Sequence, residues 1–202
     1  MLLAYVRLSV AGFLLGGILP SYHLPKMLKG IDIVKVSDDE NPGMYNAAVH
    51  AGMPIGLLCL LLDMGKGFIP VFITAQEFGT ESIMFIPVMV MPLLGHIVAP
   101  YYRFAGGKAN ATAFGVLFGL LPENLLVFAL CILFAMFSTL LKVNPHTRRV
   151  TVTYVAFSLV AFVQAIIIHS LFIACGAVLM SAIVVHRFAK SKACDPPIPR
   201  VG

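Results

Sequence analysis

Tryptophan is absent from this sequence of 202 residues, and charged residues make up only 11% of it. A typical soluble domain carries about 25% charged residues. Hydrophobic residues make up 59%, and the mean hydropathy is +0.94. A soluble fold of this length could not hide so much apolar surface, because part of it must lie outside the core. The scarcity of charge therefore excludes an ordinary soluble domain and indicates an integral membrane protein.

Motifs for metal, redox or serine chemistry are also missing. The four cysteines include no C-x-x-C pair, and three of them lie within apolar runs, so a zinc site or a disulfide framework has no support. Neither G-x-S-x-G nor H-E-x-x-H occurs. No A-x-A-like cleavage site ends the first apolar run, so we predict a retained span rather than a signal peptide. We expect no metal and no other cofactor.

Apolar runs predict an all-α, polytopic membrane protein with about seven transmembrane helices, since one span needs about 20 mostly apolar residues. We expect a single transmembrane domain, 1–190, and a disordered cytoplasmic tail, 191–202. The predicted spans are 2–20, 53–73, 83–102, a short helix at 109–121, a full span at 123–141, and two within 151–187 that divide near His169-Ser170.

Lysine and arginine gather in four segments: 21–52, 102–109, 142–150 and the C-terminal tail. With seven spans, all four fall on one side of the membrane, and the other side has none. The positive-inside rule then makes these segments and the C-terminus cytoplasmic and places the N-terminus outside. The net charge of +5 therefore reports membrane orientation, and the expected partners are membrane lipids and not nucleic acid.

The segment Gly106-Gly107-Lys108 precedes a predicted helix start. Paired glycines let backbone N–H groups converge, a helix N-terminus adds partial positive charge, and the lysine adds a full charge. These are the parts of a phosphate cradle. A helix-start turn with a lysine among the lipid headgroups explains the same pattern. The local sequence leaves both interpretations open.

The longest polar stretch contains Asn41-Pro42-Gly43, which favours a tight turn that exposes backbone N–H groups as an anion nest. An acidic cytoplasmic loop is the simpler interpretation. Asp38, Asp39 and Glu40 have the chemistry of magnesium ligands, but neighbouring carboxylates are usually just solvated.

The ionisable residues inside predicted spans include Asp63, Lys66 and His96. Asp63 and Lys66 are separated by three positions, so we expect them to pair structurally, because each alone would be costly in lipid. His96 lies near a span end and is a functional candidate for the same reason. A neutral histidine that bonds a backbone carbonyl is the alternative.

Together these segments resemble the PlsY-type bacterial glycerol-3-phosphate acyltransferase family. Its signatures read Gly-Ser-Ile-Pro at a span end, D-I-R-x-x-G-S-G-N-x-G-x-T-N in a loop, and G-H-x-F-P followed by F-x-G-G-K-G-x-A-T. A further element reads L-D-x-x-K-G. The corresponding segments here are 16–20, 32–46, 95–96 with 104–112, and 62–67.

The resemblance implies acyl transfer from acyl phosphate to the 1-hydroxyl of glycerol 3-phosphate, which gives lysophosphatidic acid for phospholipid biosynthesis. It implies a location in the bacterial cytoplasmic (inner) membrane. It assigns catalytic roles to Lys108 and His96. The substrate-binding residues it suggests are Asn41, Gly43, Asn46, Gly106, Gly107, Thr112, Lys35 and His186.

Several positions depart from the family pattern. The signature serine aligns with Gly17, and the arginine after Asp-Ile aligns with Val34, for which the adjacent Lys35 is our expected substitute. The remaining departures are Ser37-Asp38-Asp39-Glu40 for Gly-Ser-Gly, Lys108-Ala109 for Lys-Gly, and Phe188-Ala189 where the family has Glu-Asn. A noncatalytic relative that binds phospholipid or a phosphorylated ligand, or a small transporter, is the alternative function.

Overall fold

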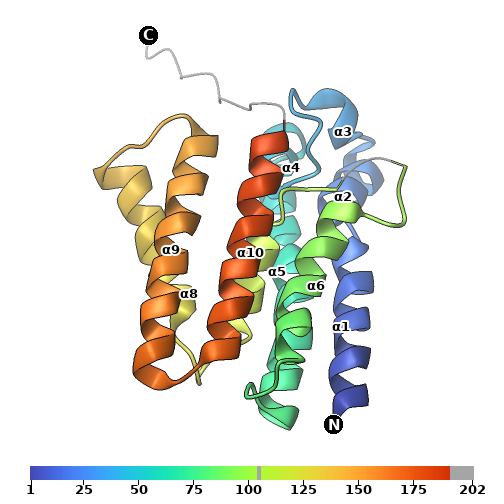
Figure 1. Cartoon of the computed structure of the whole chain (residues 1–202). Coiled ribbons are helices and arrows are strands. Elements are labelled where there is room, and N and C mark those ends of the chain that lie inside the picture. The colour runs from blue at the N-terminus through green and yellow to red at the C-terminus, as the bar shows by residue number, and fades with distance from the viewer. Residues whose placement is uncertain (104–105, 192–202) are drawn as a thin grey trace.

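A computed structural model describes residues 1–103 and 106–191, and all regular elements in this part of the chain are helices (Figure 1). The predicted tail at 191–202 therefore lies, apart from Ser191, outside the described residues. The helices are α1 (Leu2–Gly17), α2 (Pro20–Lys29), α3 (Ile33–Val36), α4 (Met44–Ala51), α5 (Met53–Phe78), α6 (Phe85–Val98), α7 (Asn110–Phe118), α8 (Leu126–Ala135), the π-helix η1 (Met136–Leu140), α9 (His146–Ile168) and α10 (Leu171–Lys190).

Each predicted apolar span corresponds to a helix. The long run at 151–187 divides as expected, because α9 ends at Ile168 and α10 begins at Leu171, with His169 in the left-handed conformation between them. The polar stretch 21–52 differs from the expected loop, since it forms α2, α3 and α4. Helices α2 and α4 pack on α5, and α3 packs on α2 and α4. Such tertiary packing stabilises helices that would be marginal alone.

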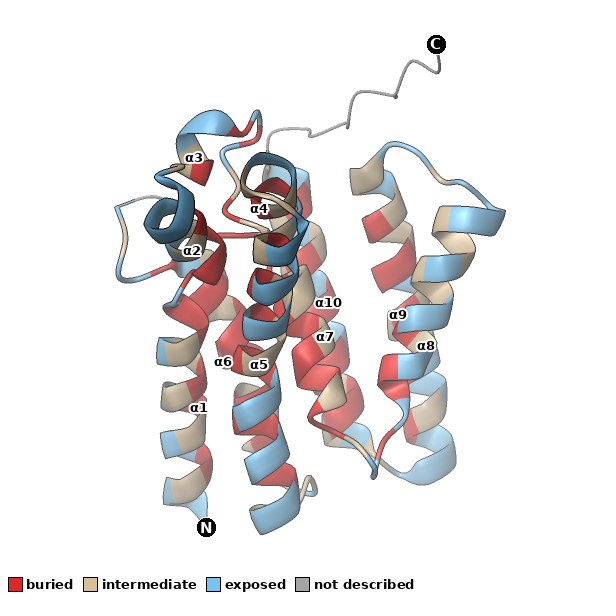
Figure 2. Ribbon diagram, turned by 180° about the vertical axis from the view of Figure 1, so that it is seen from behind, coloured by how far each residue is buried: buried red, intermediate tan, exposed pale blue. Residues whose placement is uncertain are grey.

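Four helical segments have the length and apolar character to cross a membrane: Leu2–Lys29, Met53–Phe78, His146–Ile168 and Leu171–Lys190. Two shorter apolar helices, Phe85–Val98 and Leu126–Leu140, accompany them. Large apolar side chains remain exposed along their outer faces, for example Leu159 and Ile167, while buried residues face inward (Figure 2). An exposed apolar surface of this extent fits lipid contact.

The basic segments gather at one end of the bundle. The segment from α2 to α4, the connection between α6 and α7, the turn between η1 and α9, and the C-terminal end of α10 all lie at the top of Figure 1. The N-terminus lies at the opposite end. The sequence predicted that these four segments share a side, and the helix order places them together.

The helical backbone is interrupted between α1 and α2, and the interruption exposes backbone carbonyl groups. Pro20 begins α2, and the residue before a proline is disfavoured in the helical region, so Leu19 is extended at φ −111° and ψ 88°. The carbonyl oxygens at the end of α1 then lose their partners within the helix. Lys66 from α5 donates to two of them, Gly16 O at 3.1 Å and Ile18 O at 2.7 Å.

Close backbone packing joins α5 to α7, which carries part of the site. A Cβ atom at Gly115 would overlap the carbonyl oxygen of Met64, whereas a Cβ atom at Gly65 would meet nothing within 4 Å. The glycine at position 115 therefore sets the spacing between these two helices.

We expect Gly115→Ala to destabilise the protein by about 1–3 kcal/mol, because the added methyl group must push two backbones apart. Gly65→Ala is the matched control, and alanine in a helix interior should stabilise it by about 0.5–1 kcal/mol. Thermal unfolding in detergent, followed by circular dichroism, compares the two. Equal melting temperatures would show that α5 and α7 do not pack this closely.

Candidate functional site

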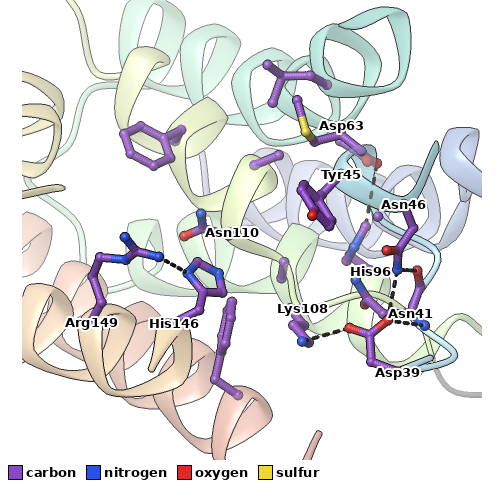
Figure 3. A pocket seen from close by; sticks show the side chains of 17 residues that line it. Asp39, Asn41, Tyr45, Asn46, Asp63, His96, Lys108, Asn110, His146 and Arg149 are labelled. Atoms are coloured by element: carbon purple, nitrogen blue, oxygen red, sulfur yellow. Dashed lines mark hydrogen bonds and ion pairs between the residues drawn. The ribbon is translucent and has the colours of Figure 1, made fainter. Parts of the chain in front are cut away.

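A cavity of about 440 Å³ opens among the N-terminal ends of α4, α7 and α9, the preceding loop at 39–43, and the C-terminal end of α10 (Figure 3). Leu60, Phe114 and Phe188 supply an apolar lining. The polar side chains that line it are Asp39, Asn41, Asn46, Asp63, His96, Lys108, Asn110, His146 and Arg149. The cavity thus combines charged groups with apolar surface, as an amphipathic ligand requires.

Lys108 lies on one wall, where its ammonium group is already paired. Its Nζ atom lies 2.9 Å from Asp39 Oδ2 and 5.1 Å from the centre of the Phe188 ring. The carboxylate also accepts from Asn46 Nδ2 at 2.8 Å and from the backbone N–H of Asn41 at 3.3 Å. Only 3% of the Asp39 side chain is exposed, so this ion pair is screened little by solvent.

The three predicted donors Asn41, Asn46 and Lys108 therefore do converge, but on a carboxylate of the chain itself. The Asp39 carboxylate accepts the hydrogen bonds that the sequence analysis assigned to a bound anion. The acidic run divides between two environments, because Asp39 is buried while its neighbours Asp38 and Glu40 are exposed. The interpretation that all three carboxylates are simply solvated was wrong for Asp39, because Lys108 approaches it from the segment before α7, 69 positions away.

Asp63, Lys66 and His96 form a buried network at the cavity wall, which Asp63 and His96 line. Lys66 Nζ lies 2.7 Å from Asp63 Oδ1, as the spacing predicted, and 2.8 Å from His96 Nδ1. Ser21 donates to the other carboxylate oxygen of Asp63 at 3.3 Å. Since a lysine ammonium only donates, His96 Nδ1 must accept, and the ring proton resides on Nε2.

His96 thus bonds a lysine rather than the backbone carbonyl considered from the sequence. Its Nε2 side faces Gly107, because a Cβ atom at Gly107 would collide with that nitrogen. The residue is 4% exposed and lines the cavity. A neutral imidazole with Nε2–H directed towards the glycine loop can donate a hydrogen bond to an anion there.

The glycine pair is held by its carbonyl groups. Arg187 from α10 donates to Gly106 O at 2.6 Å and to Gly107 O at 3.3 Å. The Gly106 N–H donates to Ile97 O at 2.9 Å, so it is not available to an anion. Ala109, where the family has glycine, adopts φ +59°. The cavity is instead lined by Asn110 and Ala111, whose N–H groups belong to the unpaired first turn of α7.

A second cationic wall comes from the start of α9. Arg149 Nη2 lies 3.2 Å from His146 Nδ1, and the His146 ring packs edge-on against Phe188 at 5.6 Å between centroids. Tyr154, one turn further on, donates to Asn110 Oδ1 at 2.8 Å and ties α9 to α7. The sequence located Arg149 only as part of a basic segment. Nothing local distinguishes it from Arg148, which is exposed.

Five of the predicted residues line the cavity: Lys108, His96, Asn41, Gly43 and Asn46. The others do not. Gly106 and Gly107 are buried outside the lining. Thr112 is fully buried on α7, and its Oγ1 atom has no hydrogen-bond partner among the described residues. Lys35 and His186 are exposed, away from the cavity lining.

Comparison with known proteins identifies one family. A family model described as glycerol-3-phosphate acyltransferase matches residues 6–192. A protein of Aquifex aeolicus named glycerol-3-phosphate acyltransferase is 32% identical over 180 residues, which are 89% of each chain. One of Thermotoga maritima, named glycerol-3-phosphate acyltransferase 2, is 41% identical over 121 residues, which span 60% of this chain and 61% of that protein.

Two solved structures share the fold. They are crystal structures of PlsY (YgiH), described as an integral membrane glycerol 3-phosphate acyltransferase, in its glycerol 3-phosphate form and its lysophosphatidic acid form. The first has a TM-score of 0.78 at 27% identity and covers 92% of this chain and 88% of PlsY. The second has a TM-score of 0.76, also at 27% identity, over 91% and 87%.

Proposed function

Because this chain belongs to the glycerol-3-phosphate acyltransferase family, we propose that it transfers an acyl group to the 1-hydroxyl of glycerol 3-phosphate and forms lysophosphatidic acid. Acyl phosphate is the proposed donor. The main support is the cavity, which sets Lys108 and Arg149 beside apolar side chains at the end of the bundle where the basic segments meet. Both substrates carry a phosphate, which the cationic side chains match, and one carries a long apolar chain, which the apolar side chains match.

We propose that the enzyme accelerates acyl transfer by positioning the substrates and by stabilising the charge that develops in the transition state. The 1-hydroxyl oxygen bonds to the acyl carbon, the bond from that carbon to the phosphate oxygen breaks, and the hydroxyl proton leaves with the released phosphate. Acyl phosphate is already activated, so the protein need not supply a covalent nucleophile. His96 would donate through Nε2–H to developing negative charge, since its Nδ1 already accepts from Lys66.

The proposed arrangement in the membrane is seven crossings with the N-terminus outside and the cavity at the cytoplasmic face of the bacterial inner membrane. Residues 1–190 would form a single domain. The shared end of the four basic segments supports this orientation through the positive-inside rule. The short helices α6 and α7 would cross only with their flanking segments, because 14 and nine residues fall below the about 20 that a full span needs.

One observation favours a second candidate, a noncatalytic relative that binds phosphorylated lipid. The Lys108 ammonium is neutralised by Asp39, and the signature serine and arginine are replaced by Gly17 and Val34. A site with fewer free donors would bind phosphate less strongly in the transition state, and binding without differential stabilisation does not accelerate chemistry.

The purified protein in lipid bilayers, given acyl phosphate and glycerol 3-phosphate, should release lysophosphatidic acid and inorganic phosphate in equal amounts. Acyl-CoA supplied in place of acyl phosphate tests the donor. Mass spectrometry measures the lipid, and a colorimetric assay measures the phosphate. Absence of product from protein with a cooperative melting transition would reject the enzyme and leave the binding candidate.

A further inference from the structure

The two cations of the cavity differ in how their charge is compensated. Lys108 is paired with the Asp39 carboxylate at 2.9 Å, so the two side chains together are neutral. Within residues 1–103 and 106–191, Arg149 has no carboxylate at ion-pair distance. Its Nη2 atom instead contacts a neutral acceptor, His146 Nδ1. The uncompensated positive charge of the cavity therefore lies on the α9 wall, and an incoming anion meets it there.

The surroundings of Arg149 are ordered by packing. His146 is in edge contact with Phe188, and Val150 and Tyr154 of the same helix are fully buried. His146 Nδ1 accepts from the guanidinium, since arginine only donates, and this contact orients the guanidinium. Arg149 is half-buried and lines the cavity on the side away from Lys108 (Figure 3).

We propose that Arg149, oriented by His146, binds the phosphate group of a substrate and takes over the role of the signature arginine that this chain lacks at Val34. The inference rests on the proposed function, because it names the phosphate anchor of the same site. The planar guanidinium of arginine presents paired N–H donors that match phosphate oxygens, which a lysine ammonium does not. Lys108 would first have to leave Asp39 to bind an anion fully.

The location distinguishes this proposal from the expectation for Lys35. Lys35 is adjacent to Val34 in sequence, but it is exposed and does not line the cavity. Arg149 is 115 positions away from Val34 in the chain (149 less 34) and still lines the cavity. Sequence proximity to the lost arginine favoured Lys35, whereas the tertiary structure favours Arg149.

The test measures binding of inorganic phosphate and of glycerol 3-phosphate to the full chain in lipid nanodiscs by isothermal titration. Arg149→Gln should weaken binding of both probes by at least about tenfold, since it removes a charge-assisted contact. Arg149→Lys keeps the charge but loses the paired donors, so it should recover only part of the affinity. Arg148→Gln, an exposed neighbour with the same charge, is the matched control and should bind as the unaltered protein does.

Several outcomes would overturn the proposal. One is unaltered phosphate affinity in Arg149→Gln, and another is an equal loss in Arg148→Gln, which would indicate only a general effect of charge. A loss in Lys35→Ala without a loss in Arg149→Gln would assign the anchor to Lys35 instead. If Arg149→Gln still melts cooperatively, its loss of affinity is not a folding defect.

Kinetics distinguish the two substrates and the two proposals. A rise in the KM for glycerol 3-phosphate alone would place the acceptor phosphate at Arg149, and a rise for acyl phosphate alone would place the donor there. Phosphate binding that depends on Arg149 in a protein without acyl transfer would reject the proposed function and keep this inference. Acyl transfer with both KM values unchanged in Arg149→Gln would keep the proposed function and reject this inference.

Discussion

Lys108→Ala is expected to lower kcat/KM for acyl transfer by about a hundredfold or more. The substitution removes a cation and also leaves the Asp39 carboxylate, 3% exposed, without its partner. Removing one donor that stabilises developing negative charge costs about 2.7–4 kcal/mol of transition-state stabilisation, and about 1.4 kcal/mol corresponds to a factor of ten in rate. The unpaired carboxylate would also repel the phosphates that enter the cavity. Initial rates at varied concentrations of both substrates measure the effect.

The double variant Asp39→Asn, Lys108→Ala separates the two contributions. It removes the buried negative charge together with the ammonium, so we expect it to recover about tenfold of the lost activity. Asp39→Asn alone should lower the KM for phosphorylated substrate, because it frees Lys108. Lys190→Ala, an exposed lysine on α10, is the control and should retain full activity. Equal activity in Lys108→Ala and the unaltered protein would remove Lys108 from the site.

Lys66→Met is expected to be the most destabilising of these substitutions. Its ammonium has four neighbours, namely the carbonyl oxygens of Gly16 and Ile18, Asp63 Oδ1 and His96 Nδ1. Methionine preserves the length of the side chain but leaves the buried Asp63 carboxylate without its counter-ion and removes the donor from two carbonyl groups. We expect a loss of about 3–5 kcal/mol in the free energy of unfolding. Unfolding by denaturing detergent, followed by circular dichroism, measures it.

Two variants make the Lys66 prediction specific. Asp63→Asn combined with Lys66→Met removes both charges and should be more stable than Lys66→Met alone, because no unpaired ion remains. Lys29→Met changes an exposed lysine at the end of α2 and should have little effect. If Lys66→Met and Lys29→Met unfold at the same detergent concentration, the network does not stabilise the break between α1 and α2.

Helix positions were predictable because each depends on a local property. Apolar length located α5, α8 and α10, and the i, i+3 spacing of Asp63 and Lys66 identified an ion pair that the structure confirms at 2.7 Å. Breaks were also readable, since His169-Ser170 separates α9 from α10. The short helices α2, α3 and α4 were missed, because their stability comes from packing on one another and, for α2 and α4, on α5, rather than from their own composition.

Some features of the site could likewise be predicted from the sequence, and others depend on the tertiary structure. The sequence by itself determined the membrane class, the order of the apolar helices, the shared side of the basic segments and the position of the Lys108 segment, because hydropathy and charge act over a few neighbouring residues. Only the tertiary structure decided that Asp39 neutralises Lys108 and that His96 accepts from Lys66. It also decided that Arg149 lines the cavity with no carboxylate at ion-pair distance in the part of the chain that the structure describes. These contacts join residues tens of positions apart, and their energies depend on burial and direction, which exist only after the helices have packed.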